Sequence, residues 1–534
     1  MLVKSLILPI REKGRYLLGL TIDTTKMMKN TREVGEVNCL ENVGSAAPGK
    51  QSAQERWSKE EEKQALRRLD WHLIPLLGGL YLCSYMDRGN IGNAKTAGMG
   101  KAWGMTSAQY SMVVTVYYIA YICFHWLILA WKVVPLPLWA ALMALGWGSM
   151  DMIQAATANY AGLLVLRILV GIFEAGFVPA IALYLSFFYH RREMGLRYGL
   201  FMSCAPLANG IASAIAYGVV HARSSLEHWQ LIFLIGTCPV VTKYYNGACQ
   251  TNALISEGAP TIILAAAAYF YLPNGPFECP LLDDRQNEII GHRAVIARGN
   301  DHEKKINFKQ AFAAFSDYKN YLQAAIIFCL NTAFGSLPAY LPTILTDMGF
   351  SNTRAEGFSA IPYLSACFFC VGISFASDYC QTRGLFISLF TSVGGAGYVI
   401  LALVSTNAVR FFATFLVCAG VFPAVSLTFT WVTDNQGSSS KRGVGLAIFG
   451  MIGQCGPLLG ARIFPSSEGP LYSRGMWICA GVLFAAAILA LVLRQLLGLE
   501  NRRRDREFGA SDARYAPPDI ADQGDEHPMY RFVL

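Results

Sequence analysis

Two ionisable residues stand inside one long apolar run of the chain. Residues 160–189 are predominantly apolar but contain Arg167 and Glu174. An ionised side chain in hydrocarbon costs at least about 2.5–3.5 kcal/mol, so these residues are functional candidates. Their spacing of seven residues is close to two helical turns, which places both side chains on one helix face, about 10 Å apart. This separation is too long for an easy direct salt bridge, so each residue needs another partner.

Each of the two residues has a partner that suits its chemistry. A substrate anion suits Arg167, because a guanidinium can bind a carboxylate through two parallel hydrogen bonds. A proton or a polar neighbour suits Glu174, because burial favours the neutral form of a carboxyl group, which can then carry a proton. The alternative is an Arg–Glu network that only holds helices together.

Polar residues also interrupt other apolar runs. They are Asp87, Arg88, His125, Asp151, Asn331, Gln454 and Arg462, and two further polar candidates of the C-terminal half, Asn435 and Gln436, directly follow the run 408–433. We expect Arg88 to share substrate binding with Arg167. Asn331 and Gln454 are candidates for substrate contact in the second half of the chain, with helix packing as the alternative. Asp87 is a candidate for gating, and an interfacial ion pair with Arg88 explains it equally well. Asp151 and Arg462 stay open between gating, binding and structural roles.

The charge composition indicates the class of protein. Of 534 residues, 54% are hydrophobic and 15% are charged, whereas soluble domains average about 25% charged residues. The 80 charged residues (44 basic and 36 acidic) include 51 that lie in residues 1–70, 273–320 and 499–534. The rest of the chain is too apolar to face water, which excludes an ordinary soluble enzyme and a disordered chain. The pattern is typical of a polytopic membrane protein with soluble ends and a soluble middle segment.

The apolar runs predict the fold. A bilayer span needs about 20 apolar residues, and twelve runs qualify, the sixth with an interruption: 72–91, 109–131, 135–157, 160–189, 196–220, 228–272, 321–346, 357–378, 384–405, 408–433, 443–465 and 473–497. Backbone groups in hydrocarbon must be satisfied within the segment, so each run predicts a helix. We expect an all-α membrane protein with an N-terminal six-helix half (residues 71–272), a cytoplasmic central loop (273–320) and a C-terminal six-helix half (321–498).

Lysine and arginine in the loops predict the topology. With residues 1–70 inside, the cytoplasmic loops carry 14 of these residues and the opposite loops carry seven. An even number of spans returns residues 499–534 to the same side. We therefore expect a multi-pass protein with two cytoplasmic tails, in the plasma membrane and as a monomer.

Several other kinds of chemistry have little support in the sequence. Residues 44–51 nearly match a phosphate-binding loop, but Gln51 stands where Ser or Thr is required and no strand precedes it, so ATP-driven transport loses its support. Cys367 and Cys370 form a C-x-x-C pair inside an apolar run with no second pair, which favours buried thiols over a metal or redox site. The sequence shows no catalytic arrangement in the soluble segments and no basic aromatic face for nucleic acid. We expect no cofactor apart from a coupling proton.

The whole pattern resembles the major facilitator superfamily and, within it, the fungal anion:cation symporters, which include allantoate, nicotinate and vitamin permeases. The motifs that carry this resemblance are Leu69 and Asp70, residues 85–92, 167–179 and 185–192, Asp378 with Arg383, and residues 453–460. The resemblance covers residues 60–505 and implies two pseudo-symmetric six-helix halves around a central cavity, with alternating access. It does not specify the substrate.

The resemblance also implies roles for single residues. Arg167 and Glu174 are similar to residues of sialin and the vesicular glutamate transporters, in which the arginine helps to bind the organic anion and the glutamate takes part in proton coupling. Asp378 and Arg383 match the loop motif that latches the two halves, although the residues between them depart from its usual basic middle.

The sequence departs from the family pattern at two places. Residues 236–256 form a 21-residue polar insert that separates two parts of the sixth run. We hypothesise that this insert is a retained intron, and sequencing the transcript decides the question. Residues 124–128 replace the family's usual Glu and Pro-Ser-Asn, so the latch between the second and third spans loses its support and His125 inherits no role. We interpret His125 as a satisfied neutral imidazole rather than a proton relay. Either departure could inactivate this chain.

The leading hypothesis is a proton-coupled importer of a small organic anion or vitamin-like carboxylate. The alternative within the same fold is an exporter of a secondary metabolite or drug. A transport-inactive sensor is a third possibility, with modest support from the two tails.

Overall fold

The structure of the chain is a computed structural model. It describes residues 57–96, 99, 103–132, 134–157, 159–220, 259–298, 307–347, 349, 352–460, 462–464, 468, 472–511 and 523–534. Residues 61–534 form one compact unit, and residues 1–60 form another. The predicted insert at residues 236–256 lies outside the described residues, as does most of the predicted N-terminal tail.

Every predicted apolar run coincides with helix in the described residues, the sixth run only in its second part. The N-terminal runs correspond to α3 (Lys59–Thr96), α5 (Ser107–Cys123) with η1 (His125–Lys132), α6 (Leu136–Ala155), α7 (Tyr160–Ala175) with α8 (Val178–Phe188), α9 (Met194–Met202) with α10 (Cys204–Val220), and α13 (Ala259–Tyr271). The C-terminal runs correspond to α16 (Tyr318–Asp347), α17 (Asn352–Cys380), α18 (Gly384–Leu403), α19 (Asn407–Asp434), α20 (Ser439–Gly460) and α21 (Ser473–Phe508).

Eight helical stretches in the described part of the chain are long and apolar enough to cross a membrane: 136–154, 160–188, 194–215, 357–380, 384–403, 407–434, 439–460 and 473–508. Two shorter apolar helices lie at 108–123 and 260–271. The long helices α3 and α16 match the two remaining predicted spans. The expected all-α membrane fold is therefore confirmed.

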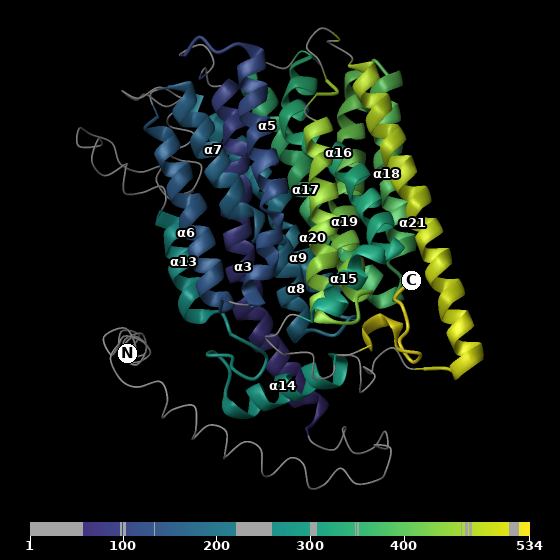
Figure 1. Cartoon of the computed structure of the whole chain (residues 1–534). Helices are drawn as coiled ribbons and strands as arrows, with labels where there is room; N and C mark the ends of the chain where they lie inside the picture. Colours follow the sequence, from purple (N-terminus) through teal and green to yellow (C-terminus); the bar gives the residue numbers. More distant parts are fainter. Residues whose placement is uncertain are drawn as a thin grey trace, which may run out of the picture. The chain divides into compact units, whose positions relative to one another are not determined.

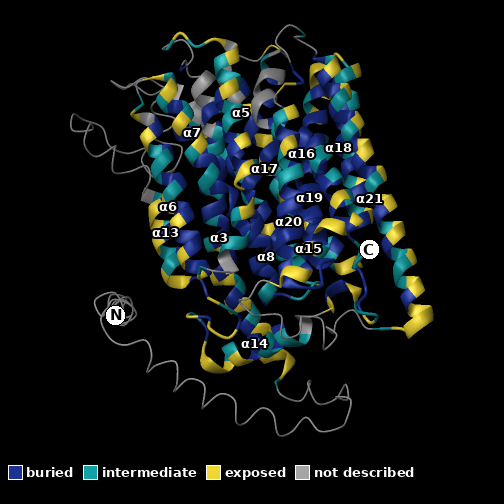
Figure 2. Cartoon of the chain, in the orientation of Figure 1, coloured by how far each residue is buried: buried dark blue, intermediate teal, exposed yellow. Residues whose placement is uncertain are grey.

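The helices stand side by side in one bundle (Figure 1). In the N-terminal half, α6 packs between α7 and α13, and α5 packs against α7. In the C-terminal half, α18 packs between α19 and α21, and α16 packs against α20. The two halves meet where α10 and α9 contact α17 and where α5 contacts α20. The core sits at this junction, because α8, α19 and α20 are mostly buried while α6, α18 and α21 expose one side (Figure 2).

Apolar side chains cover the outside of the bundle as well as its inside. Phe368 on α17 is 80% exposed and Ile488 on α21 is 62% exposed. Water would disfavour so much exposed hydrocarbon, whereas lipid does not. The bundle is therefore built to lie in a bilayer.

Local sequence signals explain where α7 begins and ends. The side chain of Asn159 accepts a hydrogen bond from the backbone N–H of Gly162 at 2.7 Å, which caps the first turn. The helix ends at Ala175, and Pro179 stands in the first turn of α8. A proline has no N–H to donate and clashes with the carbonyl four residues earlier, which here belongs to Ala175. The break follows directly after Glu174.

Two segments expected to be soluble loop or tail are more ordered than predicted. The central segment contains α14 (Asp284–Arg298) and α15 (Phe308–Ser316). Beyond residue 498, α21 continues to Phe508, and Asp525, Tyr530, Arg531 and Phe532 are buried. Their charges suggested solvation, but several of them form ion pairs: Asp525, for example, lies 2.6 Å from the Nζ of Lys319. Sequence alone cannot tell a paired charge from a solvated one.

Candidate functional site

An ion pair between two neighbouring helices stands at the centre of the candidate site. The guanidinium Nη2 of Arg88 on α3 lies 3.1 Å from Oε2 of Glu174 on α7. The Glu174 side chain is fully buried, and that of Arg88 is 16% exposed. Glu174 also accepts hydrogen bonds from Ser84 Oγ at 2.6 Å and from the hydroxyl of Tyr117. The partner that the spacing of Arg167 and Glu174 demanded for the glutamate is therefore Arg88.

Aromatic rings surround the guanidinium of Arg88. Its Cζ lies 5.6 Å from the ring centre of Tyr85, 5.4 Å from that of Tyr117 and 5.3 Å from that of Tyr121. A cation over an aromatic face is attracted by the ring's negative centre, the more so when water is excluded. The rings stabilise the charge of Arg88 without neutralising it, so the arginine can still bind an anion.

Arg167 lies in a second buried cluster of the same half. It is 2% exposed, and its charged neighbours include Asp87 on α3 and Asp151 on α6. Gln154 donates a hydrogen bond to Asp151 at 2.8 Å. Asp87, the candidate for gating, is fully buried beside Asp151. Two carboxyls and one guanidinium share this cluster, because α3, α6 and α7 converge there.

A cavity lies between the two halves. It is lined by Tyr81, Tyr85, Arg88, Tyr121, His125, Val178, Pro179, Met202, Ile327, Asn331, Phe334, Val425, Phe429, Phe449, Gly450 and Gln454. One cavity is thus lined by three of the predicted substrate-binding residues, namely Arg88, Asn331 and Gln454. Asn331 also donates a hydrogen bond to the carbonyl of Gly453 on α20 at 3.1 Å. Arg167, the fourth, is not among the lining residues.

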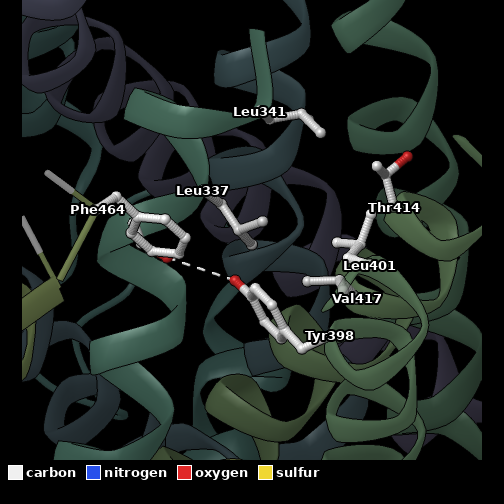
Figure 3. A pocket seen from close by; sticks show the side chains of 8 residues that line it. Leu337, Leu341, Tyr398, Leu401, Thr414, Val417 and Phe464 are labelled. Atoms are coloured by element: carbon white, nitrogen blue, oxygen red, sulfur yellow. Dashed lines mark hydrogen bonds between the residues drawn. The ribbon is translucent and has the colours of Figure 1, made fainter. Parts of the chain in front are cut away.

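A second pocket lies within the C-terminal half (Figure 3). It is lined by Ser336, Leu337, Leu341, Tyr398, Leu401, Thr414, Val417 and Phe464. The hydroxyl of Tyr398 lies 3.4 Å from Oγ of Ser336, and the other side chains are mainly apolar. The lining contains no charged residue, so this pocket offers nothing to hold an anion.

The predicted latch residues bridge the two halves. The carboxylate of Asp378, near the end of α17, accepts hydrogen bonds from the backbone N–H groups of Gly195 (3.2 Å) and Leu196 (2.6 Å) in the first turn of α9. Nη1 of Arg383 lies 2.5 Å from Asp378, and its Nη2 donates to the carbonyl of Arg191 at 3.0 Å. A carboxylate at a helix N-terminus satisfies free N–H groups and complements the helix dipole.

Some site residues were not found from the sequence. Ser84, Tyr117 and Tyr121 gave no signal, because hydroxyl and aromatic residues are ordinary in apolar helices. The one available signal was spacing: Ser84 precedes Arg88 by four residues, and Tyr117 precedes Tyr121 by four, which places each pair on one helix face. Which faces meet depends on helix packing.

The comparisons with known proteins place the chain in a family. The sequence model of the Major Facilitator Superfamily matches residues 77–242 and 251–461. The chain belongs to this superfamily. The match is interrupted at residues 243–250, inside the predicted insert.

Curated relatives are fungal transporters of the superfamily. MFS transporter prlL from a fungal species (strain NRRL 50135) is 29% identical over 497 residues, which cover 90% of this chain and 96% of that protein. The high-affinity nicotinic acid transporter of Saccharomyces cerevisiae is 29% identical over 448 residues, 83% of this chain and 79% of that protein. Relatives of this kind are transporters rather than enzymes.

Solved structures share the fold. The proton:xylose symporter XylE aligns with a TM-score of 0.60 at 14% identity and covers 81% of this chain and 96% of its own. The human organic anion transporter MFSD10 aligns with a TM-score of 0.55 at 11% identity, covering 79% of this chain and 99% of its own. The major facilitator fold and a secondary transport function follow for this multi-pass membrane protein.

Proposed function

We propose that this facilitator imports a small organic anion together with protons by alternating access. The observation that carries the proposal is the Arg88–Glu174 ion pair beside the central cavity. A guanidinium is a binding group for a carboxylate, and here it is held by a carboxylate of the protein. A substrate anion therefore competes with Glu174 for Arg88.

Protonation of Glu174 couples the transport of a proton to the transport of the substrate anion. When Glu174 is ionised, it neutralises Arg88. A substrate anion then gains little binding free energy from the arginine at the cavity. When Glu174 takes up a proton, the charge of Arg88 is left uncompensated at a buried site, which a substrate anion can then neutralise. Proton and anion thus enter together, and loss of the proton on the other side restores the ion pair and expels the anion.

The cavity chemistry favours a planar, ring-containing acid. Tyr81, Tyr85 and Tyr121 line one side, and aromatic residues of the C-terminal half line the other. Aromatic rings stack on planar groups and bury much apolar area. A relative that the comparisons identify carries nicotinic acid, which is an aromatic carboxylate. We propose a carboxylate of this general class, which is consistent with an anion:cation symporter.

The topology is part of the proposal. We infer that the bundle end with the latch is cytoplasmic, because Arg191, Arg383 and Arg442 gather there, and positive residues favour the inner side. Both chain ends would then be cytoplasmic, with the protein acting as a monomer in the plasma membrane and requiring no cofactor beyond the coupling proton. Epitope accessibility at each end in intact and permeabilised cells tests the orientation.

The decisive experiment measures uptake in proteoliposomes with and without an inward proton gradient. The probes are labelled carboxylates, ureides and vitamins, and the variants are Arg88→Gln and, as a matched control, Arg474→Gln. Arg474 is 76% exposed and lies outside the cavity, so its loss should not affect uptake. We expect proton-driven uptake of at least one carboxylate that Arg88→Gln abolishes.

Two results would overturn the proposal. Uptake that is indifferent to the gradient would exclude proton symport. Uptake that survives Arg88→Gln unchanged would exclude the arginine as the anion site. Uptake that occurs only when the lumen is more acidic than the outside, so that protons leave as substrate enters, would favour the exporter.

A further inference from the structure

The prediction of a satisfied imidazole is wrong for His125, on the wall of the cavity, because the described residues offer its ring no hydrogen-bond partner. His125 is fully buried and lines the cavity, and in the described part of the chain neither of its ring nitrogens forms a hydrogen bond. Buried polar groups almost always have a partner, because an unpaired one loses its hydration without compensation. The mechanism proposed above does not use this imidazole. A ligand atom in the cavity would supply the missing partner.

The position of His125 results from a change of helix type. The α-helix α5 ends at Cys123, and His125 begins the tighter helix η1. Its Nε2 points at Gly450 on α20, where a Cβ would collide with the imidazole ring. The imidazole therefore approaches the opposite half where that half has no side chain. The imidazole ring fills the space that a side chain at position 450 would occupy, and His125 and Gly450 both line the cavity.

Tyr121 connects His125 with the anion site. The ring centres of Tyr121 and His125 are 5.4 Å apart, and the Cζ of Arg88 lies 5.3 Å from the ring centre of Tyr121. Both Arg88 and His125 line the cavity, so a ligand whose carboxylate reaches Arg88 and whose ring lies against Tyr121 extends toward His125.

We propose that His125 is a specificity-determining residue that hydrogen-bonds a polar ring atom of an aromatic carboxylate bound at Arg88. This inference rests on the proposed function and adds to it the position of a second polar atom on the substrate. A buried site that forms a hydrogen bond with its substrate rejects analogues that lack the bonding atom, because the protein group is then left unpaired.

The test compares two probes that differ at one ring atom. Nicotinate and benzoate have the same carboxylate, but only nicotinate has a ring nitrogen. KM for proton-driven uptake is measured for the unmodified protein, His125→Phe, His125→Asn and the control His72→Phe, whose histidine is exposed. Loss of one hydrogen bond should raise KM for nicotinate about tenfold in His125→Phe. KM for benzoate should stay within about twofold, and His125→Asn should recover part of the loss.

The outcomes separate this inference from the proposed function. Equal changes for both probes, or no change for either, would overturn the role of His125 while leaving anion symport intact. An unmodified protein that takes up neither probe but takes up a non-aromatic carboxylate would also overturn it. Failure of Arg88-dependent uptake for every anion would instead remove the proposed function.

A separate observation concerns residues 523–534, here called the C-terminal clamp. Asp525 lies 2.6 Å from Nζ of Lys319 on α16 and 2.8 Å from Nζ of Lys441 on α20. The hydroxyl of Tyr530 donates to the carbonyl of Asp434 at 3.0 Å, and Trp431 Nε1 donates to the carbonyl of Val533 at 2.9 Å. The clamp therefore ties together the ends of α16, α19 and α20.

The same segment reaches the latch and the other half. The backbone N–H of Arg383, the latch arginine, donates to the carbonyl of Leu534 at 2.5 Å. From the N-terminal half, the guanidinium of Arg191 stacks on the ring of Tyr530 at 4.3 Å and donates to the carbonyl of Arg531 at 3.3 Å. Separation of the halves at this end would break the contacts of Arg191 with the clamp.

We infer that the C-terminal clamp stabilises the state in which the latch end of the bundle is closed. The test places spin labels at positions 192 and 381, which face each other across this end, since Gln381 donates to the carbonyl of Arg192 at 3.5 Å. Asp525→Asn weakens the clamp from the side of the C-terminal half, and Arg191→Ala removes its link to the N-terminal half. Glu526→Gln is the control, since it changes a neighbouring carboxyl of the same segment.

We expect the label distances to shift toward longer values in Asp525→Asn and Arg191→Ala, and not in Glu526→Gln. Distances that stay unchanged in both variants, while a third label on the clamp itself reports its release, would overturn the inference. Because the readout is a distance, the result does not depend on the identity of the substrate.

Discussion

The carboxylate of Glu174 lies 3.1 Å from the guanidinium of Arg88, and this pair lies beside the cavity between the two halves. A buried ion pair is a poor source of net stability, because desolvation offsets much of the attraction. It is well suited to a switch, however, since removing one charge leaves the other uncompensated. The proposed coupling of proton and anion depends on this property.

Neutralising Glu174 should uncouple transport from protons. In Glu174→Gln, Arg88 is no longer neutralised, so anion binding should persist or strengthen while uptake loses its dependence on external pH. Uptake at several pH values and substrate binding to the purified protein measure the two effects. Glu174→Asp, which keeps the charge, is the control. A pH profile identical to that of the unmodified protein would exclude Glu174 as the proton site.

The positive charge of Arg167 should stabilise the folded protein, because Asp87 and Asp151 are buried near it. Arg167 is the guanidinium shared by Asp87 and Asp151, so Arg167→Gln leaves buried carboxyls without a compensating charge. Buried carboxyls that lose a nearby positive charge destabilise the folded state, because their ionised forms are then uncompensated. Thermal unfolding of the purified protein should therefore show a marked loss in Arg167→Gln and a small one in Asp87→Asn. Equal losses would contradict this assignment and leave Arg167 open to a direct substrate role.

Adding one methyl group at the latch should impair transport. A Cβ at position 195 would collide with both Asp378 and Arg383, so Gly195→Ala must displace the latch. Gly372, on α17, has open space around its Cα, and Gly372→Ala is therefore the matched control. We expect uptake to fall about tenfold or more in Gly195→Ala at unchanged expression, as expected for a loss of roughly 1–3 kcal/mol through overpacking. Normal uptake would show that transport tolerates the displacement of Asp378 and Arg383 from α9.

The C-terminal clamp should stay docked on the bundle at mildly acidic pH. Burial alone would raise the pKa of Asp525, but the ammonium groups of Lys319 and Lys441 hold this pKa below its usual value. A carboxyl with a lower pKa in the docked state stabilises docking at pH above about 4 and loses that contribution as the pH falls through the lowered pKa. Amide hydrogen exchange of residues 523–534, corrected for the intrinsic rate, should show protection at pH 7 and at pH 5. Release between these values would contradict the assignment.

Several features of the fold were accessible from the sequence, because the bilayer constrains it so strongly. Long apolar runs have one stable form in lipid, so α18 and α19 lie within two residues of their predicted bounds, whereas α21 continues to Phe508, past its predicted end at residue 497. The latch pair Asp378 and Arg383 was found by its motif, and the structure places both against the other half. The C-terminal segment was misread as a solvated tail because Asp525 is paired by residues more than 80 positions away, such as Lys441.

The sequence by itself predicted an all-α membrane protein with twelve apolar spans and marked the rare charges in these spans as the functional candidates. Both conclusions follow from local properties, namely hydrophobicity, helical period and the cost of charge in hydrocarbon. The tertiary structure decided which charges meet. Arg167 and Arg88 were both predicted as anion-binding residues, and of the two only Arg88 pairs with Glu174 at 3.1 Å and lines the cavity. A partner on another helix depends on rotation and register, which no spacing along one helix can specify.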